Sequence, residues 1–360
     1  MNGLYRIMSK RIYVSGTNKI EISGLSKSGD EILDVLLSLG YELRDNPKSD
    51  FLINFNHNSA SYKAFLKNGG ARNRAILIRL EPTAVHPIQY KKSILVNYGL
   101  VLSPGYVIVD EFNAERINFP YRYHKNPAVP VAGNRSLKSV MNEEYRKDTY
   151  EDWQNRNLAA TLIAANKVSA SSDNYYGIRR NLANKMSELE LSLFGPLWRA
   201  NLFTKIRHRL AVAYFSLKSG VIPNLKSVYG HLHRRYVNAR GTVADKHEIL
   251  KQSKFNLVIE NAPETVSEKL FDALIAGAIP IYMGPNLERF NLPESLVIET
   301  DGSIEHVRKI INNYEEGKIK EILKSGSDFI TSDQFMNEWA ADKVNSKIAR
   351  VIDKYIEDQI

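Results

Sequence analysis

Apolar runs alternate with amphipathic segments along the first 110 residues. Five runs are short and rich in apolar residues, as buried strands are: residues 11–14, 51–55, 75–80, 94–102 and 106–109. Two segments between them show helical spacing and are followed by glycine: residues 30–39 and 59–67. Strands that alternate with helices predict a parallel sheet with helices on both faces.

The same rhythm returns after residues 119–139, which are rich in Pro, Asn and Arg and predict a linker. Beyond the linker the pattern predicts these helices: 142–157, 179–187 and 267–276. It predicts these strands: 159–165, 190–194, 255–259 and 279–283. The chain therefore reads as two α/β domains in tandem.

The end of the chain predicts one more helix, because Val344, Ile348, Ile352 and Ile356 fall on one side of a helix over 341–360. We predict an N-terminal α/β domain over 1–135, a C-terminal α/β domain over 150–330 and an amphipathic helical tail over 331–360. Open α/β sheets bind ligands at the carboxyl ends of their strands, so residues that directly follow a strand are the candidates for a site.

Composition narrows the class of protein. The chain has 360 residues, of which 43% are hydrophobic and 25% are charged, as in globular proteins. It has no cysteine, which excludes disulfides, iron–sulfur clusters, cysteine zinc sites and a thiol nucleophile. No apolar run approaches the ~20 residues of a membrane span, and the first residues lack the apolar core of a signal peptide. We therefore expect a cytoplasmic protein.

Positive charge is concentrated in one stretch. Between Trp198 and Lys254 there are twelve Lys and Arg residues against Asp245 and Glu248, so this stretch carries +10 and the rest of the chain sums to −1. An anionic partner would explain it: a nucleotide diphosphate, a phosphorylated glycan or the inner face of an anionic membrane. A solvated basic face is the alternative. Nucleic acid is disfavoured, because the nearby aromatic residues form no repeated stacking pattern.

The most informative segment is residues 254–285, which reads as strand, loop, helix, glycine and strand. The first strand delivers Glu260 and Asn261 at its carboxyl end. Thr265 and Glu268 fit a capping box at the start of the following helix. Lys269 then lies in the first helical turn, where the helix dipole disfavours a cation. A diphosphate held between the helix amides and the ammonium group would explain this placement, whereas a surface lysine is the plain alternative.

This segment resembles the donor-site motif of the family 10 glycosyltransferases, the α-1,3/1,4-fucosyltransferases. The matching residues are Ile259-Glu260-Asn261, Thr265-Val266-Ser267-Glu268-Lys269, Ala276-Gly277, Ile279-Pro280-Ile281 and Gly284-Pro285. Residues 163–182 resemble the family's strand, loop and arginine-bearing helix, and Leu80-Glu81-Pro82 resembles the motif that holds its catalytic base. The resemblance implies the GT-B architecture: two Rossmann-like domains facing a cleft, with the acceptor mainly on the first and the donor on the second.

The resemblance also implies an inverting transfer, of fucose from GDP-fucose to a hydroxyl of a surface glycan of lipopolysaccharide or capsule type. Glu81 is then the general base. The implied donor-binding residues are Arg179, Arg180, Asn261, Val266, Ser267, Glu268 and Lys269. Among them, Lys269 and Arg179, or its neighbour Arg180, grip the diphosphate, and Glu268 binds the ribose.

Two alternatives stay open. Thr265 stands where the family usually has tyrosine, which leaves room for another GDP- or UDP-sugar as donor. A non-catalytic protein that binds anionic glycans or a membrane surface would also use the basic stretch and the tail. No Asp-x-Asp motif is present, so we predict that no cofactor or metal is required and leave stimulation by a divalent cation open. A zinc site at His231 and His233, or a metal site at Asp245 and His247, is disfavoured by the lack of further ligands.

Overall fold

The computed structural model describes residues 10–16, 30–105, 113–123, 137–143, 145–218, 220–229, 232, 234 and 236–360. The chain divides into two units, each with its own parallel sheet. The first unit consists of Met1–Glu81, Gln89–Pro120 and Ala341–Ile360, and the second of Pro82–Ile88 and Tyr121–Ala340. The predicted strand at 106–109 lies outside the described residues.

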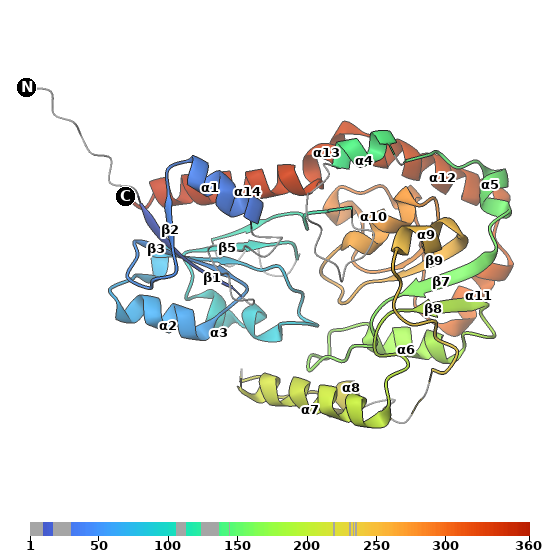
Figure 1. The fold of residues 1–360 in the computed structure, drawn as a ribbon, viewed down its shortest axis with the longest axis horizontal. Coiled ribbons are helices and arrows are strands. Elements are labelled where there is room, and N and C mark those ends of the chain that lie inside the picture. Colours follow the sequence, from blue (N-terminus) through green and yellow to red (C-terminus); the bar gives the residue numbers. More distant parts are fainter. Residues whose placement is uncertain are drawn as a thin grey trace, which may run out of the picture. The chain divides into compact units, whose positions relative to one another are not determined.

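The first unit is built on a sheet with the strand order β2-β1-β3-β4-β5-β6 (Figure 1). Neighbouring strands run parallel, as the sequence predicts. The strands are β1 (Arg11–Gly16), β2 (Glu42–Arg44), β3 (Phe51–Phe55), β4 (Ala75–Ile78), β5 (Leu100–Ser103) and β6 (Ala114–Arg116). The helices are α1 (Asp30–Ser38), α2 (Ser59–Lys67), α3 (Lys92–Leu95) and α14 (Ala341–Glu357).

Both faces of this sheet are covered, and its central strands are buried along their whole length. Every residue of β3 and β4 is buried, which is the pattern of parallel strands between two helix layers. Side chains such as Ile53 and Ile76 pack with α1 and α14 on one face. Alternate residues such as Leu52 and Leu77 pack on the other face, with Phe65 of α2.

The predicted strand at 94–102 is wrong in its first half. Ile94 lies on the short helix α3, and the chain turns before β5 begins at Leu100. The turn ends where the Gly99 N–H donates to the carbonyl of Ala75 (2.9 Å) and brings the chain alongside β4. Both parts of this segment are rich in apolar residues, and Leu95 and Leu100 are both buried, so hydrophobicity alone does not separate the helical turn from the strand.

The predicted tail over 331–360 is divided between the two units. Residues through Ala340, including α13 (Asp333–Glu338), belong to the second unit, and α14 belongs to the first. The apolar face of α14 packs in the core of the first unit, where Ile348, Ile352 and Ile356 are 0% exposed. It is therefore part of the first unit's core rather than a separate tail.

The second unit has a parallel sheet with the order β11-β10-β9-β7-β8 (Figure 1). The strands are β7 (Leu158–Ile163), β8 (Leu191–Phe194), β9 (Ser253–Ile259), β10 (Ile279–Met283) and β11 (Ile298–Glu299). The helices are α4 (Leu137–Glu143), α5 (Tyr150–Gln154), α6 (Tyr176–Asn184), α7 (Leu202–Lys218), α8 (Leu225–Tyr229), α9 (Lys246–Lys251), α10 (Glu268–Ile275), α11 (Ile304–Asn312), α12 (Glu316–Ile330) and α13. Short 3₁₀ helices occur at Arg72–Arg74, Pro87–Tyr90, Glu288–Phe290 and Glu294–Leu296.

Two expectations for the start of this unit are corrected. The single helix predicted over 142–157 is α4 and α5, because Thr149 caps α5 by accepting from the Asp152 N–H (3.1 Å) and starts a new helix there. Within the predicted linker, Tyr121 is 1% exposed and its N–H donates to the Trp339 carbonyl (2.8 Å). Tyr121 is thus fixed in the second unit's core, and residues 124–136 of the linker lie outside the described residues.

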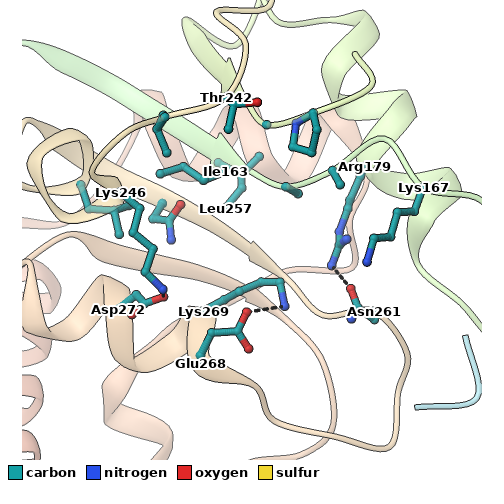
Figure 2. Close-up of a pocket in the computed structure, with 17 residues that line it drawn as sticks. Ile163, Lys167, Arg179, Thr242, Lys246, Leu257, Asn261, Glu268, Lys269 and Asp272 are labelled. Atoms are coloured by element: carbon teal, nitrogen blue, oxygen red, sulfur yellow. Dashed lines mark hydrogen bonds and ion pairs between the residues drawn. The ribbon is translucent and has the colours of Figure 1, made fainter. Parts of the chain in front are cut away.

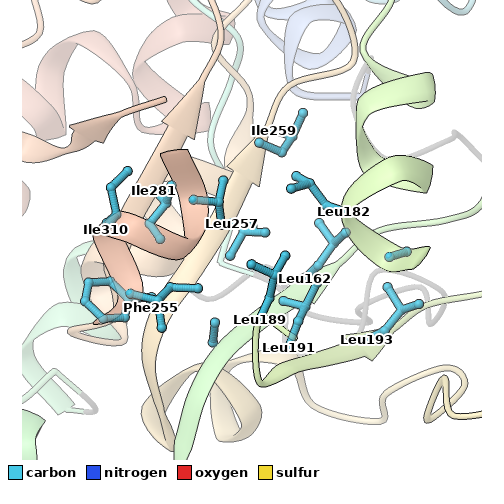
Figure 3. Packing of buried hydrophobic residues seen from close by; sticks show 14 of the residues in the cluster. Leu162, Leu182, Leu189, Leu191, Leu193, Phe255, Leu257, Ile259, Ile281 and Ile310 are labelled. Atoms are coloured by element: carbon cyan, nitrogen blue, oxygen red, sulfur yellow. The ribbon is translucent and has the colours of Figure 1, made fainter. Parts of the chain in front are cut away.

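The sheet of the second unit is buried on both faces. Leu257 and Ile281 point into the cluster drawn in Figure 3, together with Leu182 of α6 and Ile310 of α11. On the other face, Val258 packs in a second cluster with α10, α12 and α13. This double burial explains why β9 and β10 are predicted well from their runs rich in apolar residues. Among the described residues, no helix combines the length and apolarity that a membrane crossing needs.

Candidate functional site

The strand order of the second sheet places a switch point between β7 and β9. The chain goes from β7 to β8 on one side and then crosses to β9 on the other, so the two connections leave in opposite directions. In open parallel sheets, ligands bind at such a point, outside the carboxyl ends of the strands. Ile163 and Asn261, both labelled in Figure 2, mark the carboxyl ends of β7 and β9.

A cavity of about 390 Å³ lies at this switch point (Figure 2). Its charged lining consists of four cations and two carboxylates, contributed by the loop after β7 and by α6, α9 and α10: Lys167, Arg179, Lys246, Lys269, Glu268 and Asp272. Asn261, Gly195 and Pro196 line it as well. The positive charge and the size suit an anionic small molecule.

Arg179 fixes the end of β9 to α6. Its Nε donates to the carbonyl of Ile259 (3.1 Å), and its guanidinium also donates to Oδ1 of Asn261 (2.9 Å). The side chain is 3% exposed, and burial lowers the pKa of its guanidinium, which an arginine still keeps protonated at neutral pH. Arg179 therefore holds Asn261 in place and brings a buried positive charge to the cavity.

The capping box predicted for Thr265 and Glu268 is wrong. Helix α10 begins at Glu268 with Ser267 as its N-cap residue, and the Ser267 side chain does not cap the helix. Instead, the buried carboxylate of Glu260 accepts from the Ser267 N–H (2.8 Å) and from its hydroxyl (2.6 Å). A carboxylate from the preceding strand thus satisfies the start of the helix, which a local sequence pattern does not reveal.

Lys269 is held at the start of α10 by its neighbours. Its Nζ donates to Oγ of Ser267 (2.7 Å) and lies 3.5 Å from Oε2 of Glu260 and 3.6 Å from Oε1 of Glu268. These contacts offset the unfavourable helix dipole at this position. The lysine side chain is 19% exposed and reaches the cavity, so its ammonium group is available to an anion there.

Glu268 remains ionised in this setting. Removal from water acts to raise its pKa, but the ammonium groups of Lys269 and Lys246 outweigh this and lower the pKa to about 2. A carboxylate that is charged at all physiological pH values is an acceptor only. Glu268 is therefore suited to accept hydrogen bonds from hydroxyl groups of a ligand in the cavity.

Lys246 and Asp272 form a buried ion pair that the sequence reading missed as part of the site. Lys246 follows Asp245, which caps α9 by accepting from the His247 N–H (2.9 Å), and it is 6% exposed. Asp272 of α10 also accepts from the Tyr121 hydroxyl (3.0 Å), and burial raises the pKa of its carboxyl. Asp272 lies one helical turn after Glu268, and this spacing is the one local signal that relates it to the site.

The remaining predicted donor residues lie outside the cavity lining. Arg180 donates from Nη1 to the carbonyl of Lys167 (2.7 Å) and is 2% exposed, and burial lowers the pKa of its guanidinium to about 10. Val266 is 1% exposed and packs in the hydrophobic cluster around α10. Ser267 binds Glu260 and Lys269 as described. The structure thus gathers Arg179, Asn261, Glu268 and Lys269 around one cavity.

Glu81 belongs to the first unit, where it follows β4. Its backbone is clamped: Oδ1 of Asn56 accepts from the N–H groups of Leu80 (2.9 Å) and Glu81 (3.0 Å), and Nε2 of Gln89 donates to the Glu81 carbonyl (2.8 Å). Asn56 follows β3 in the left-handed conformation (φ 57°), which asparagine tolerates better than most residues. These bonds fix the position of Glu81 at the carboxyl edge of its sheet.

In the described part of the chain, no three or more His, Asp and Glu side chains lie close enough together to hold a metal ion. His231 and His233 lie outside the described residues. Asp245 and His247 serve α9: the first caps the helix, and the ring of the second stacks on Tyr123 at 4.1 Å between centroids.

Comparison with known proteins relates the chain to glycosyltransferases. No family model matches the sequence. A fucosyltransferase-like protein of Arabidopsis thaliana is 45% identical over 87 residues, which is 22% of this chain and only 16% of that protein's length. The crystal structure of an α1,3-fucosyltransferase aligns over 99% of this chain and 93% of its own, with a TM-score of 0.51 and 14% identity.

A second structure, Anabaena HepE in complex with UDP, aligns over 96% of this chain and 100% of its own, with a TM-score of 0.52 and 10% identity. Both are GT-B glycosyltransferases. This chain has the GT-B fold. The GT-B fold predicted from the sequence is thereby confirmed, and the cavity at the β7–β9 switch point lies in the second unit.

Proposed function

We propose that this protein is an inverting glycosyltransferase that transfers fucose from GDP-fucose to a hydroxyl of a surface glycan. The observation that carries the proposal is the cavity between β7 and β9, where four cations outnumber two carboxylates and where Arg179 and Lys269 accompany the ionised carboxylate of Glu268. A nucleoside diphosphate needs both, because its phosphates seek cations and its ribose hydroxyls seek acceptors. The fucosyltransferase-like relative and the family 10 motif support fucose as the sugar.

In this proposal the cations act on the leaving group. As the acceptor oxygen attacks the anomeric carbon, the bond from that carbon to the diphosphate breaks and negative charge grows on the phosphate oxygens. Lys269 and Arg179 stabilise that charge from fixed positions, which lowers the barrier because they need no rearrangement. Lys246 is held by Asp272 and adds to the positive field. Glu268 orients the ribose.

Glu81 takes the proton of the attacking hydroxyl in the same proposal. The clamp formed by Asn56 and Gln89 supports this role, because a general base must be held within hydrogen-bond reach of its proton. Replacing Glu81 by Gln removes the basic oxygen and keeps the size. We expect turnover to fall by about 10²–10⁴-fold while the dissociation constant of the donor stays unchanged. A protein that only binds glycans would show no turnover in either form.

A UDP-sugar is the second candidate donor. It is favoured by the likeness to HepE, whose structures hold UDP and UDP-glucose. It is also favoured by Thr265, which is 5% exposed and leaves the cavity without the tyrosine of the family motif.

Isothermal titration calorimetry distinguishes GDP-fucose from a UDP-sugar as the donor. GDP, GDP-fucose, GDP-mannose, UDP and UDP-glucose are titrated into the wild type and into Lys269→Met. We expect GDP and GDP-fucose to bind the wild type, and Lys269→Met to bind them at least about tenfold more weakly, because a charge-assisted hydrogen bond contributes about 1.5–3 kcal/mol. Lys324→Met, an exposed lysine of α12 outside the cavity, is the matched control and should bind as the wild type does.

Three results would change the assignment. A preference for UDP and UDP-glucose would keep the transferase and replace its donor. Equal loss in Lys269→Met and Lys324→Met would mean that the cavity is not the donor site. Binding of no nucleotide at all would contradict the enzymatic proposal.

A further inference from the structure

Helix α7 exposes an apolar stripe to solvent. Phe203 is 75% exposed, Leu210 53%, Tyr214 60% and Leu217 59%. Their spacings of seven, four and three residues place them on one face of the helix. Helix α8 packs against α7 (Figure 1) and adds Leu225, with Ile222 just before it, as further exposed apolar residues. We call Phe203, Leu210, Tyr214 and Leu217 the apolar stripe.

The opposite face of α7 is cationic and buried. Lys205 is 7% exposed and its Nζ donates to the carbonyl of Arg234 (2.6 Å). Arg209 is 3% exposed and donates from NH1 to the carbonyl of Tyr229 (3.0 Å). A surface helix ordinarily buries its apolar side and exposes its charges, whereas α7 exposes the apolar stripe and buries Lys205 and Arg209. The hydrogen bonds of these two buried cations hold the helix in an orientation that leaves its apolar side facing solvent.

The stretch of sequence around the apolar stripe contains basic residues and no acidic ones. Residues 191–244 contain nine Lys and Arg residues and no Asp or Glu. Among the described cations of this stretch, Arg199, Arg207, Lys226 and Arg240 are exposed. Arg207 lies on the same face as the stripe, four residues after Phe203 and three before Leu210. The exposed surface of α7 and α8 therefore combines aromatic and aliphatic side chains with positive charge that no acidic residue of the same stretch neutralises.

We infer that α7 and α8 dock onto an anionic lipid surface, with the apolar stripe in the boundary between headgroups and acyl chains and with Arg207 and Lys226 against lipid phosphates. Interfacial helices have this combination of apolar side chains and cations. A second copy of the chain fits less well, because it would bring a surface of the same positive sign against this one. Helix α14, the other candidate for a membrane contact, has its apolar face buried in the first unit.

Vesicle co-sedimentation tests this inference independently of the proposed enzymatic function. The full chain is mixed with vesicles of phosphatidylcholine alone and with vesicles that also contain phosphatidylglycerol. The stripe variant carries Phe203→Gln, Leu210→Gln and Tyr214→Gln. The matched control replaces apolar residues of similar exposure in the first unit: Leu37→Gln, Leu39→Gln and Val96→Gln.

We expect the wild type and the control variant to bind the anionic vesicles alike, and the stripe variant to bind them at least about tenfold more weakly, because it loses most of the apolar area. Binding should weaken with added salt and on phosphatidylcholine alone. A second variant, Arg207→Gln with Lys226→Gln, tests the charges without touching the stripe. It should lose about fivefold per cation on anionic vesicles only.

Equal binding of the stripe variant and the wild type would overturn the inference, as would binding that ignores the lipid charge. So would a wild type that dimerises in the ultracentrifuge while the stripe variant stays monomeric, because the stripe would then cover a second copy. A lower thermal midpoint in the stripe variant than in the control would mean that the stripe contacts its own chain, and would overturn it as well.

Discussion

Glu268 carries a negative charge beside the ammonium groups of Lys269 and Lys246, and these two cations tie its ionisation to the folded state. Its folded pKa of about 2 lies below its ordinary value of 4.5. The unfolded chain therefore binds its proton at a higher pH than the folded chain does. The stabilisation is fully present above pH 4.5 and is lost as the pH falls from about 4.5 toward about 2.

Glu268→Gln should remove this part of the acid sensitivity. We expect the free energy of unfolding of the variant to fall less steeply than that of the wild type across this pH window, measured by urea denaturation at several pH values. Glu305→Gln, an exposed carboxylate of α11, serves as the control and should follow the wild type. Parallel curves for Glu268→Gln and the wild type would contradict the assigned pKa.

Some residues of the candidate site could be predicted from the sequence and others could not. Asn261, Glu268 and Lys269 could be predicted because they stand together in one motif between two well-marked strands. The ion pair of Lys246 with Asp272 joins residues that are 26 positions apart, and no local pattern relates them. The hydrogen bonds from Ser267 to the carboxylate of Glu260 also join residues that no local pattern relates, and a capping box of Thr265 with Glu268 was predicted instead.

Elements were predictable where burial on both faces gave a continuous apolar run. Strands β3, β4, β9 and β10 lie within one or two residues of their predicted bounds. The helix and strand between 92 and 103 were merged, because both are apolar and the turn between them is set by pairing with β4. The long predicted helix at 142–157 was divided by a cap whose strength depends on geometry that the sequence pattern does not contain.

The carboxyl end of β8 depends on Gly195. This residue lines the cavity with φ at +122°, and a Cβ built on it would lie 2.1 Å from the carbonyl oxygen of Ala164, at the end of β7. Gly195→Ala must therefore strain the backbone and push the two strand ends apart. We expect a loss of at least about 1–3 kcal/mol in the free energy of unfolding, with weaker nucleotide binding measured by calorimetry.

The control for this substitution lies in α12. Gly317 has open space around its Cα and an ordinary helical conformation, so Gly317→Ala should stabilise the protein by about 0.5–1 kcal/mol. Opposite signs for the same chemical change would show that the close approach at Gly195 matters rather than the loss of a glycine. A Gly195→Ala variant as stable as the wild type would mean that β7 and β8 can separate without cost.

At the scale of the whole molecule, each unit has its own core, and the last helix of the chain completes the core of the first one. Ile352 of α14 is 0% exposed and packs in the cluster with α1, β1 and β3. Ile352→Ala removes buried methyl groups there and should cost about 2–5 kcal/mol of the first unit's stability. Arg350→Ala, an exposed neighbour on the same helix, should cost little.

Because each unit has its own core, a substitution that destabilises the first unit should leave ligand binding in the second unit unchanged. The residues that line the cavity proposed to bind the nucleotide all lie in the second unit, so Ile352→Ala should leave the dissociation constant of the nucleotide near that of the wild type. Glu81 lies in the first unit, so turnover near the melting temperature should fall in the same variant. Calorimetry and thermal inactivation, measured on one preparation, check both expectations. Loss of nucleotide affinity in step with thermal stability would mean that the two units fold as one, and that the proposed donor site depends on the core that α14 completes.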